Sequence, residues 1–168
     1  QNELPYEELG LKTPDKKATI TTYIKEMYPD YQDPFNRPLV IICPGGGYDH
    51  HSPREGESMA IKMLELGDNA VVLRYSLAPY VYPTQVDEAA YTVKWVRDHA
   101  KEWEVNPDRI ILAGFSAGGH LAACLGTMWS GDMVASFAKK YLGCDKEYVR
   151  PDGLLLGYPV ITAGENSH

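Results

Sequence analysis

The chain has 168 residues, of which 44% are hydrophobic and 23% are charged, as in ordinary globular proteins. This length suits one domain of about 100–200 residues. The 16 basic and 23 acidic side chains give a net charge of −7, which argues against binding to nucleic acid or to an anionic membrane surface. No stretch approaches the ~18 consecutive apolar residues of a membrane span. We therefore expect neither a nucleic-acid partner nor a membrane partner.

The three cysteines, Cys43, Cys124 and Cys144, are too few and too scattered for a disulfide framework. None of them has the C-x-x-C spacing of a zinc site, and we expect neither a metal nor another cofactor. Packed, reduced thiols are typical of a reducing compartment, which slightly favours the cytoplasm over secretion. The sequence begins at Gln1 rather than Met, so the compartment stays open.

The first 38 residues predict little regular structure. Residues 1–17 are polar and rich in turn formers, which indicates an irregular arm. Ala18–Ile24 is β-branched and alternating, as in a partly exposed strand. Three prolines predict a loop over Tyr28–Pro38.

From residue 39 onward, short apolar runs alternate with helical stretches. Strands are predicted over Leu39–Cys43, Ala70–Leu73, Ile110–Ala113 and Leu154–Leu156, and the first three are expected to be buried. Helices are predicted over Pro53–Leu66 with Gly67 as its C-cap, from Thr84 along an apolar face that reaches Trp103, and over Ala117–Met128. Thr84 and Asp87 also match a capping box. This alternation predicts an α/β fold with a mostly parallel sheet, which binds its ligands at the carboxyl ends of the strands.

A nucleophile motif follows the third of these buried strands. Gly114-Phe115-Ser116-Ala117-Gly118 matches G-x-S-x-G, in which a serine occupies a sharp turn between a strand and a helix. The glycines are needed because side chains two residues before and after the serine would collide with the crossing backbone. The alternative is a glycine-rich turn with an idle serine.

A glycine-rich loop, Pro44-Gly45-Gly46-Gly47-Tyr48, follows the first buried strand. Backbone N–H groups in such a loop can stabilise the oxyanion of a tetrahedral intermediate, although they could also cradle a phosphate. The loop has neither the G-x-G-x-x-G spacing nor the Lys and Ser/Thr of a P-loop, which disfavours nucleotide binding. Together, the loop and the serine turn indicate acyl transfer.

At this point the chain resembles an α/β-hydrolase of the esterase/lipase group with the HGGG-type loop, in its acetyl-xylan-esterase-like or carbohydrate-esterase-like branch. The matching segments are PGGGY at 44–48, SPREGE at 52–57, RYSLAP at 74–79, NPDRIILAGFSAGGHLA at 106–122 and GYPVIT at 157–162. Pro44 stands where many relatives have His. The resemblance implies a three-layer sandwich and a serine carboxylic ester hydrolase for short acyl esters, including acetylated carbohydrates. It implies Ser116 as the nucleophile and the N–H groups of Ala117 and of Gly46 or Gly47 as oxyanion donors.

The resemblance also implies residues that complete the catalytic triad, in the chain order Ser, then Asp or Glu, then His. After Ser116 the only histidines are His120 and His168, and the acids include Asp132, Asp145, Asp152 and Glu165. The triad acid would follow a strand later than Leu154–Leu156. We therefore expect residues 1–168 to be the N-terminal portion of one domain, truncated before the last strands and catalytically incomplete. Leu154–Leu156 would then be an apolar sheet edge that favours homo-oligomers.

The remaining polar residues near the motifs have competing interpretations. A packed, structural role is favoured for His120, because a residue one helical turn after the serine is poorly aimed to act as its base. Tyr48, His50 and His51 follow the glycine loop and are candidate substrate contacts, against a solvated loop. The clustered tyrosines at 48, 75, 80 and 82 could stack on a sugar or lie there by chance. Arg54, Glu55 and Glu57 are expected to fix the loop rather than to contact substrate.

Two other functions stay open at this stage. The chain could be a non-catalytic, receptor-like relative that keeps the pocket and lacks the triad. It could also be a peptidase or thioesterase, because the fold does not determine the function.

Overall fold

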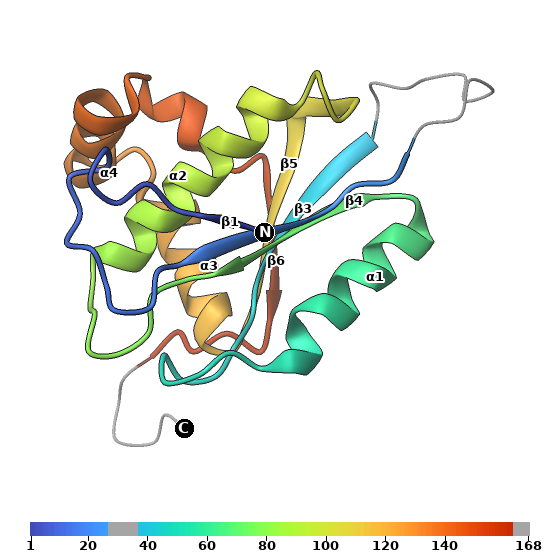
Figure 1. Cartoon of the computed structure of the whole chain (residues 1–168), viewed down its shortest axis with the longest axis horizontal. Helices are drawn as coiled ribbons and strands as arrows, with labels where there is room; N and C mark the ends of the chain where they lie inside the picture. The colour runs from blue at the N-terminus through green and yellow to red at the C-terminus, as the bar shows by residue number, and fades with distance from the viewer. Residues whose placement is uncertain (27–36, 163–168) are drawn as a thin grey trace.

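The computed structural model describes residues 1–26 and 37–162, which form a sheet with helices on both faces (Figure 1). The strands are β1 (Asn2–Glu3), β2 (Thr19–Tyr23), β3 (Arg37–Cys43), β4 (Asn69–Arg74), β5 (Val105–Phe115) and β6 (Gly153–Gly157), in the spatial order β1-β2-β4-β3-β5-β6. β4, β3, β5 and β6 are parallel, whereas β1 and β2 pair antiparallel. The predicted mostly parallel sheet is confirmed.

In the described part of the chain the α-helices are α1 (Glu57–Leu66), α2 (Thr84–His99), α3 (Ala117–Met128) and α4 (Asp132–Phe137). Short 3₁₀ or π-helical turns cover Pro53–Glu55, Ala138–Leu142 and Lys146–Val149. Figure 1 shows α1 on one face of the sheet and the other three helices on the opposite face. The three-layer sandwich implied by the resemblance is therefore present.

Alternating side chains of the central strands form two separate cores, one on each face of the sheet. Val40, Ile42 and Val72 pack on the face that α1 covers. Leu39, Ile41 and the other buried residues of the larger core pack beneath α2 and α3. Burial on both faces explains why these strands are continuously apolar in the sequence.

The beginnings and ends of the helices were predicted unevenly. Gly67 ends α1 in the left-handed conformation at φ 94°, and its N–H donates to the carbonyls of Leu64 and Met63, as a helix C-cap does. The expected helix over 53–66 instead divides at Gly56 into a 3₁₀ turn and α1. The capping box was wrong. Pro83 is the N-cap of α2, Thr84 is already helical, and no side chain caps the helix.

The N-terminal arm is the larger correction. Residues 1–17 include strand β1 and three almost fully buried side chains, those of Leu4, Tyr6 and Leu9. The Tyr6 hydroxyl donates to the buried Glu88 carboxylate and accepts from the Ala18 N–H at 2.9 Å. The arm therefore adds β1 as an edge strand beside β2 and buries three side chains, and it is not an irregular segment.

The β6 edge of the sheet is apolar and exposed. Leu154, Leu155 and Leu156 of β6 are 41%, 43% and 39% exposed, so the predicted apolar edge is present. Most of the expected loop over 28–38 lies outside the described residues, and Arg37 and Pro38 already belong to β3.

All three cysteines are free thiols. Within residues 1–26 and 37–162, no helix is long and apolar enough to cross a membrane.

Candidate active site

Ser116 occupies the turn between β5 and α3 in a strained conformation. Its φ of 51° and ψ of −117° lie in a region that L-residues rarely adopt. Hydrogen bonds fix the backbone there: the Ser116 N–H donates to the Gly157 carbonyl at 3.0 Å, and the Ser116 carbonyl accepts from His120 at 3.0 Å and Val160 at 3.2 Å. The side chain is half-buried at the N-terminus of α3, where the helix dipole favours negative charge.

The two motif glycines permit this turn because the backbone approaches them too closely for a side chain. A Cβ on Gly114 would lie 2.1 Å from the Gly118 carbonyl oxygen. A Cβ on Gly118 would lie 2.0 Å from the carbonyl oxygen of Cys43 in the neighbouring strand β3. The steric reason given for these glycines is confirmed.

The glycine loop after β3 packs directly against the serine turn. A Cβ on Gly45 would lie 2.7 Å from the Phe115 carbonyl oxygen and 3.0 Å from Ser116 Cβ. Gly46 and Gly47 have positive φ angles of 130° and 65°. Among the described residues, the N–H groups of Gly46, Gly47 and Ala117 have no hydrogen-bond acceptor, so they are available to an incoming anion.

Glu55 joins three segments around this site. One carboxylate oxygen accepts the Gly45 N–H at 2.8 Å, and the other accepts the hydroxyl of Tyr158, which follows β6. The hydrogen bond to the carboxylate raises the pKa of Tyr158. The expectation that the charged segment fixes the loop is confirmed for Glu55, whereas Arg54 and Glu57 are exposed. The role of Tyr158 was missed, and its position at the carboxyl end of a strand was the available signal.

His120 is held between Tyr48 and Cys124. Its Nδ1 lies 2.8 Å from the Tyr48 hydroxyl and its Nε2 lies 3.4 Å from Cys124 Sγ. Both ring nitrogens are therefore engaged away from Ser116, as expected of a packed histidine. A mainly apolar pocket of about 280 Å³ adjoins this trio. Its other lining residues include Tyr80, Tyr82, Val86 and Leu121.

The three candidate substrate residues after the glycine loop are separated by the fold. Tyr48 lines the apolar pocket, whereas His50 is exposed beside Asp49, with 3.7 Å between His50 Nδ1 and the carboxylate. His51 packs edge-on against Tyr75, with 4.8 Å between ring centroids, and lines a larger cavity of about 820 Å³. Burial, followed by nearby positive charges, lowers the pKa of His51 to about 4.

The described residues do not complete a triad. Within 1–26 and 37–162, no histidine ring nitrogen is hydrogen-bonded to the Ser116 hydroxyl. Asp152, which precedes β6, accepts hydrogen bonds from Arg97 of α2 and from the Ile110 N–H of β5, six residues before Ser116. Asp132 and Asp145 are exposed, and Glu165 and His168 lie outside the described residues. In the same ranges no cluster of three His, Cys, Asp or Glu side chains could hold a metal ion.

The BD-FAE family matches residues 26–148 of the chain. The acetylxylan esterase of Xylanibacter ruminicola is 31% identical over 152 residues, covering 90% of this chain and 27% of the esterase. An α/β-hydrolase from a Medee basin deep-sea metagenome library is 36% identical with a TM-score of 0.73, over 89% of this chain and 55% of that structure. An acetyl ester-xyloside bifunctional hydrolase of Caldicellulosiruptor lactoaceticus is 31% identical with a TM-score of 0.74, over 92% and 53%.

The fold expected from the resemblance is thus confirmed as that of the α/β-hydrolases. The chain spans about half the length of these solved structures and about a quarter of the curated acetylxylan esterase.

Proposed function

The chain belongs to the BD-FAE family, and from this membership we propose that it carries the nucleophile and oxyanion hole of a serine carboxylic ester hydrolase. The single observation that supports the proposal best is the strained Ser116, held against a glycine loop in which the N–H groups of Gly46 and Gly47 are free. A turn that stores strain at a serine, next to unpaired amide donors, fits covalent catalysis better than a structural role.

The proposed reaction has two steps. The Ser116 hydroxyl attacks the ester carbonyl carbon, and its proton passes to a general base. The developing oxyanion is bound by the Ala117 N–H and by the N–H of Gly46 or Gly47. The alcohol then departs with the proton, and water hydrolyses the acyl-serine by the same route. Each lost oxyanion donor is expected to cost about 10²–10³ in rate.

We assign the general base and its carboxylate to residues outside 1–26 and 37–162. His120 has both ring nitrogens engaged by Tyr48 and Cys124, and His99 lies at the far end of α2. The α/β-hydrolase order of serine, acid and histidine likewise places both groups after Ser116. A second polypeptide that supplied them would satisfy the same chemistry.

Short acyl esters of carbohydrates are the proposed substrates. Two proteins similar to this chain are named for acetyl ester or acetylxylan hydrolysis. Tyr48, His50 and His51 are the proposed substrate contacts. Tyr48 lines the apolar pocket beside the first turn of α3, and His51 lines the larger cavity next to it. The small apolar pocket suits a compact acyl or aryl group better than a charged one.

Hydrolysis by the longest natural polypeptide that contains residues 1–168 tests the proposal. p-Nitrophenyl acetate, acetylated xylo-oligosaccharides, an acetyl thioester and a peptide amide are compared. We expect the acetyl esters to have the highest kcat/KM, and Ser116→Ala to lower it by about 10⁴-fold or more. Ser136→Ala, an exposed serine on α4, is the matched control.

Three outcomes would contradict the proposal. A preference for the thioester or the amide would indicate a thioesterase or a peptidase. Saturable ligand binding without turnover would indicate a receptor-like relative. Activity that survives Ser116→Ala would place the nucleophile elsewhere.

A further inference from the structure

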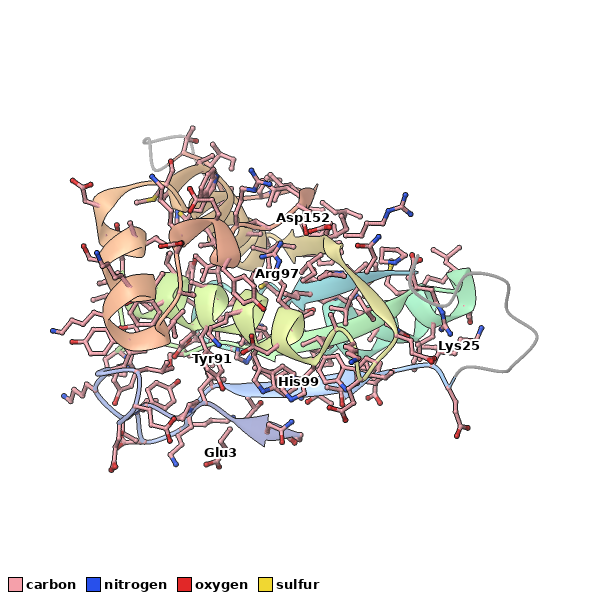
Figure 2. The ribbon with its side chains drawn as sticks, turned by 90° about the horizontal axis from the view of Figure 1, so that it is seen from above. Glu3, Lys25, Tyr91, Arg97, His99 and Asp152 are labelled. Carbon is pink, nitrogen blue, oxygen red and sulfur yellow. The ribbon has the colours of Figure 1, made fainter. Side chains whose placement is uncertain are left out.

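Aromatic side chains gather in a cavity far from Ser116, between β1, β2 and the second half of α2. The cavity has a volume of about 370 Å³. We call it the aromatic groove and define it by Glu3, Thr22, Tyr91, Trp95, His99 and Trp103, which all line it. In Figure 2, Tyr91 and His99 follow one another along α2, and Glu3 lies across from them on β1.

Three rings of the aromatic groove pack against one another, with Trp95 edge-on to Trp103 at 5.0 Å between centroids. The Trp95 and His99 centroids are 4.5 Å apart, and His99 and Trp103 are stacked at 4.8 Å with an interplanar angle of 21°. His99 Nδ1 lies 2.7 Å from the Trp95 carbonyl oxygen, which fixes the central ring. All three rings are half-buried, so their neighbours hold them in place while part of each ring lines the cavity.

Polar groups surround this ring surface. Asn2, Thr22 and two carboxylates, Glu3 and Glu102, also line the cavity, and no lysine or arginine is among its lining residues. Glu3 forms an ion pair with Lys17 at 3.0 Å, whereas the exposed Glu102 has no ion pair among the described residues. The cavity therefore offers ring faces and hydrogen-bond acceptors together, with a negative field that disfavours anions.

The aromatic groove continues toward the amino ends of the parallel strands. A second cavity of about 590 Å³ shares Glu102 and Trp103 with it and extends to Ile24, Lys25 and Glu26. Together the two cavities run along β2 and one residue past it, from Ile20 to Ile24, a span of roughly 13 Å at ~3.3 Å per residue, and Lys25 is a cation at their far end. Ser116 follows β5, which β4 and β3 separate from β2 in the sheet, so the two sites are separate.

We propose that the aromatic groove binds a linear, neutral polysaccharide. A pyranose ring presents C–H groups on its faces, which pack on the negative faces of indole rings, and hydroxyls on its edge, which donate to carboxylates. The groove is elongated and open, so it suits a chain rather than one enclosed small molecule. The choice of xylan among neutral polysaccharides rests on the proposed function. The expectation of a neutral polysaccharide rests on the residues of the groove alone. Bound there, a polymer would be held near the ester site without occupying it.

Affinity electrophoresis of the 168-residue chain in native gels containing soluble xylan tests this proposal. We expect xylan to retard the chain. Trp103→Ala and Glu102→Gln should each weaken binding, the former by about 5–10-fold. Glu102→Gln keeps shape and removes charge at an exposed position, so it remains informative if Trp103→Ala is poorly folded. Trp129→Phe, which alters the one tryptophan outside the groove, and Ser116→Ala are the matched controls and should leave retardation unchanged.

Four results would overturn the proposal. The first is that xylan does not retard the chain, and the second is that retardation persists unchanged in both groove variants. The third is a preference for a cationic polymer such as chitosan, which would indicate a cation site, and the fourth is loss of retardation in Ser116→Ala, which would place the polymer at the ester site. The assay measures binding and not ester hydrolysis, so failure here is distinguishable from failure of the proposed function.

Discussion

The serine turn and the aromatic groove differ in the parts of the chain that build them. At the carboxyl end of the parallel strands the site is built from the backbone: Gly118 contacts a carbonyl of β3, Gly45 contacts Ser116, and free N–H groups line the turn. At the β1–β2 edge of the sheet, the aromatic groove is built from side chains such as Trp95 and Trp103. A backbone-built site tolerates almost no added atom, whereas a side-chain-built site loses its ligand contacts when a ring is removed. The following predictions break or sharpen this difference.

Gly118→Ala should have the largest effect, because its methyl group would lie 2.0 Å from the Cys43 carbonyl oxygen and neither backbone can yield cheaply. We expect a loss of about 3 kcal/mol or more in the free energy of unfolding, or failure to fold. Urea denaturation followed by circular dichroism measures it. Gly131→Ala is the control, since its added methyl would meet only the Met128 carbonyl oxygen at 3.3 Å. Equal stability of the two variants would show that the carboxyl end is not tightly packed.

Glu55 tests whether a side chain supports the backbone-built site. Glu55→Ala removes the acceptor of both the Gly45 N–H and the Tyr158 hydroxyl, so the glycine loop should lose its position. We expect kcat of the longest natural polypeptide to fall about 10²-fold with a smaller change in KM. Glu55→Gln keeps one acceptor oxygen and should recover most of the rate. If alanine and glutamine at this position behave alike, or if only KM changes, Glu55 does not position the loop.

His51 makes the carboxyl end sensitive to pH. Its pKa is lowered from 6.5 to about 4 by burial, so between these values the unfolded chain binds more protons than the folded one. Stability should therefore fall as the pH falls from 6.5 to 4, by about 1–2 kcal/mol once its partial exposure is allowed for. Melting temperature against pH should show this slope reduced in His51→Gln. The exposed His50→Gln is the control, and an unchanged slope in His51→Gln would refute the assignment.

The β6 edge extends the comparison to a surface that neither site uses. Three half-exposed leucines in a row on an edge strand favour pairing with another chain. Leu155→Lys should weaken self-association of the 168-residue chain at high concentration, lowering the free energy of association by ~1 kcal/mol in magnitude. Sedimentation velocity measures this, with Leu66→Lys, an exposed leucine at the end of α1, as the control. A wild-type chain that stays monomeric at every concentration would contradict the expectation.

The geometry of the serine turn was predictable from the sequence because glycines, a serine and apolar strands are local signals. Gly114 and Gly118 fall at fixed spacing around Ser116, and α3 begins and ends where its apolar pattern does. The N-terminal arm was missed because the buried Tyr6 forms hydrogen bonds with Ser76 and Glu88, which are 70 and 82 positions away in the sequence. Local pattern carries no trace of such contacts.

The same limit explains the capping box and the aromatic groove. Asp87 has a carboxyl oxygen buried without a partner among the described residues, and burial raises its pKa to about 7, so tertiary packing overrode the local capping signal. The aromatic groove joins residues from β1, β2, α2 and the segment before β5. Only the fold brings Glu3 to Trp103.

Fluorophosphonate labelling of the longest natural polypeptide, followed by peptide mass spectrometry, tests most directly whether Ser116 is the nucleophile. The reagent forms a stable bond with a serine that is activated by a base and faces an oxyanion hole. We predict one phosphonylated residue, Ser116, and loss of the label in Ser116→Ala with the fold retained. Stoichiometric labelling at another residue, or no label on a folded protein that hydrolyses acetyl esters, would contradict the assignment of Ser116.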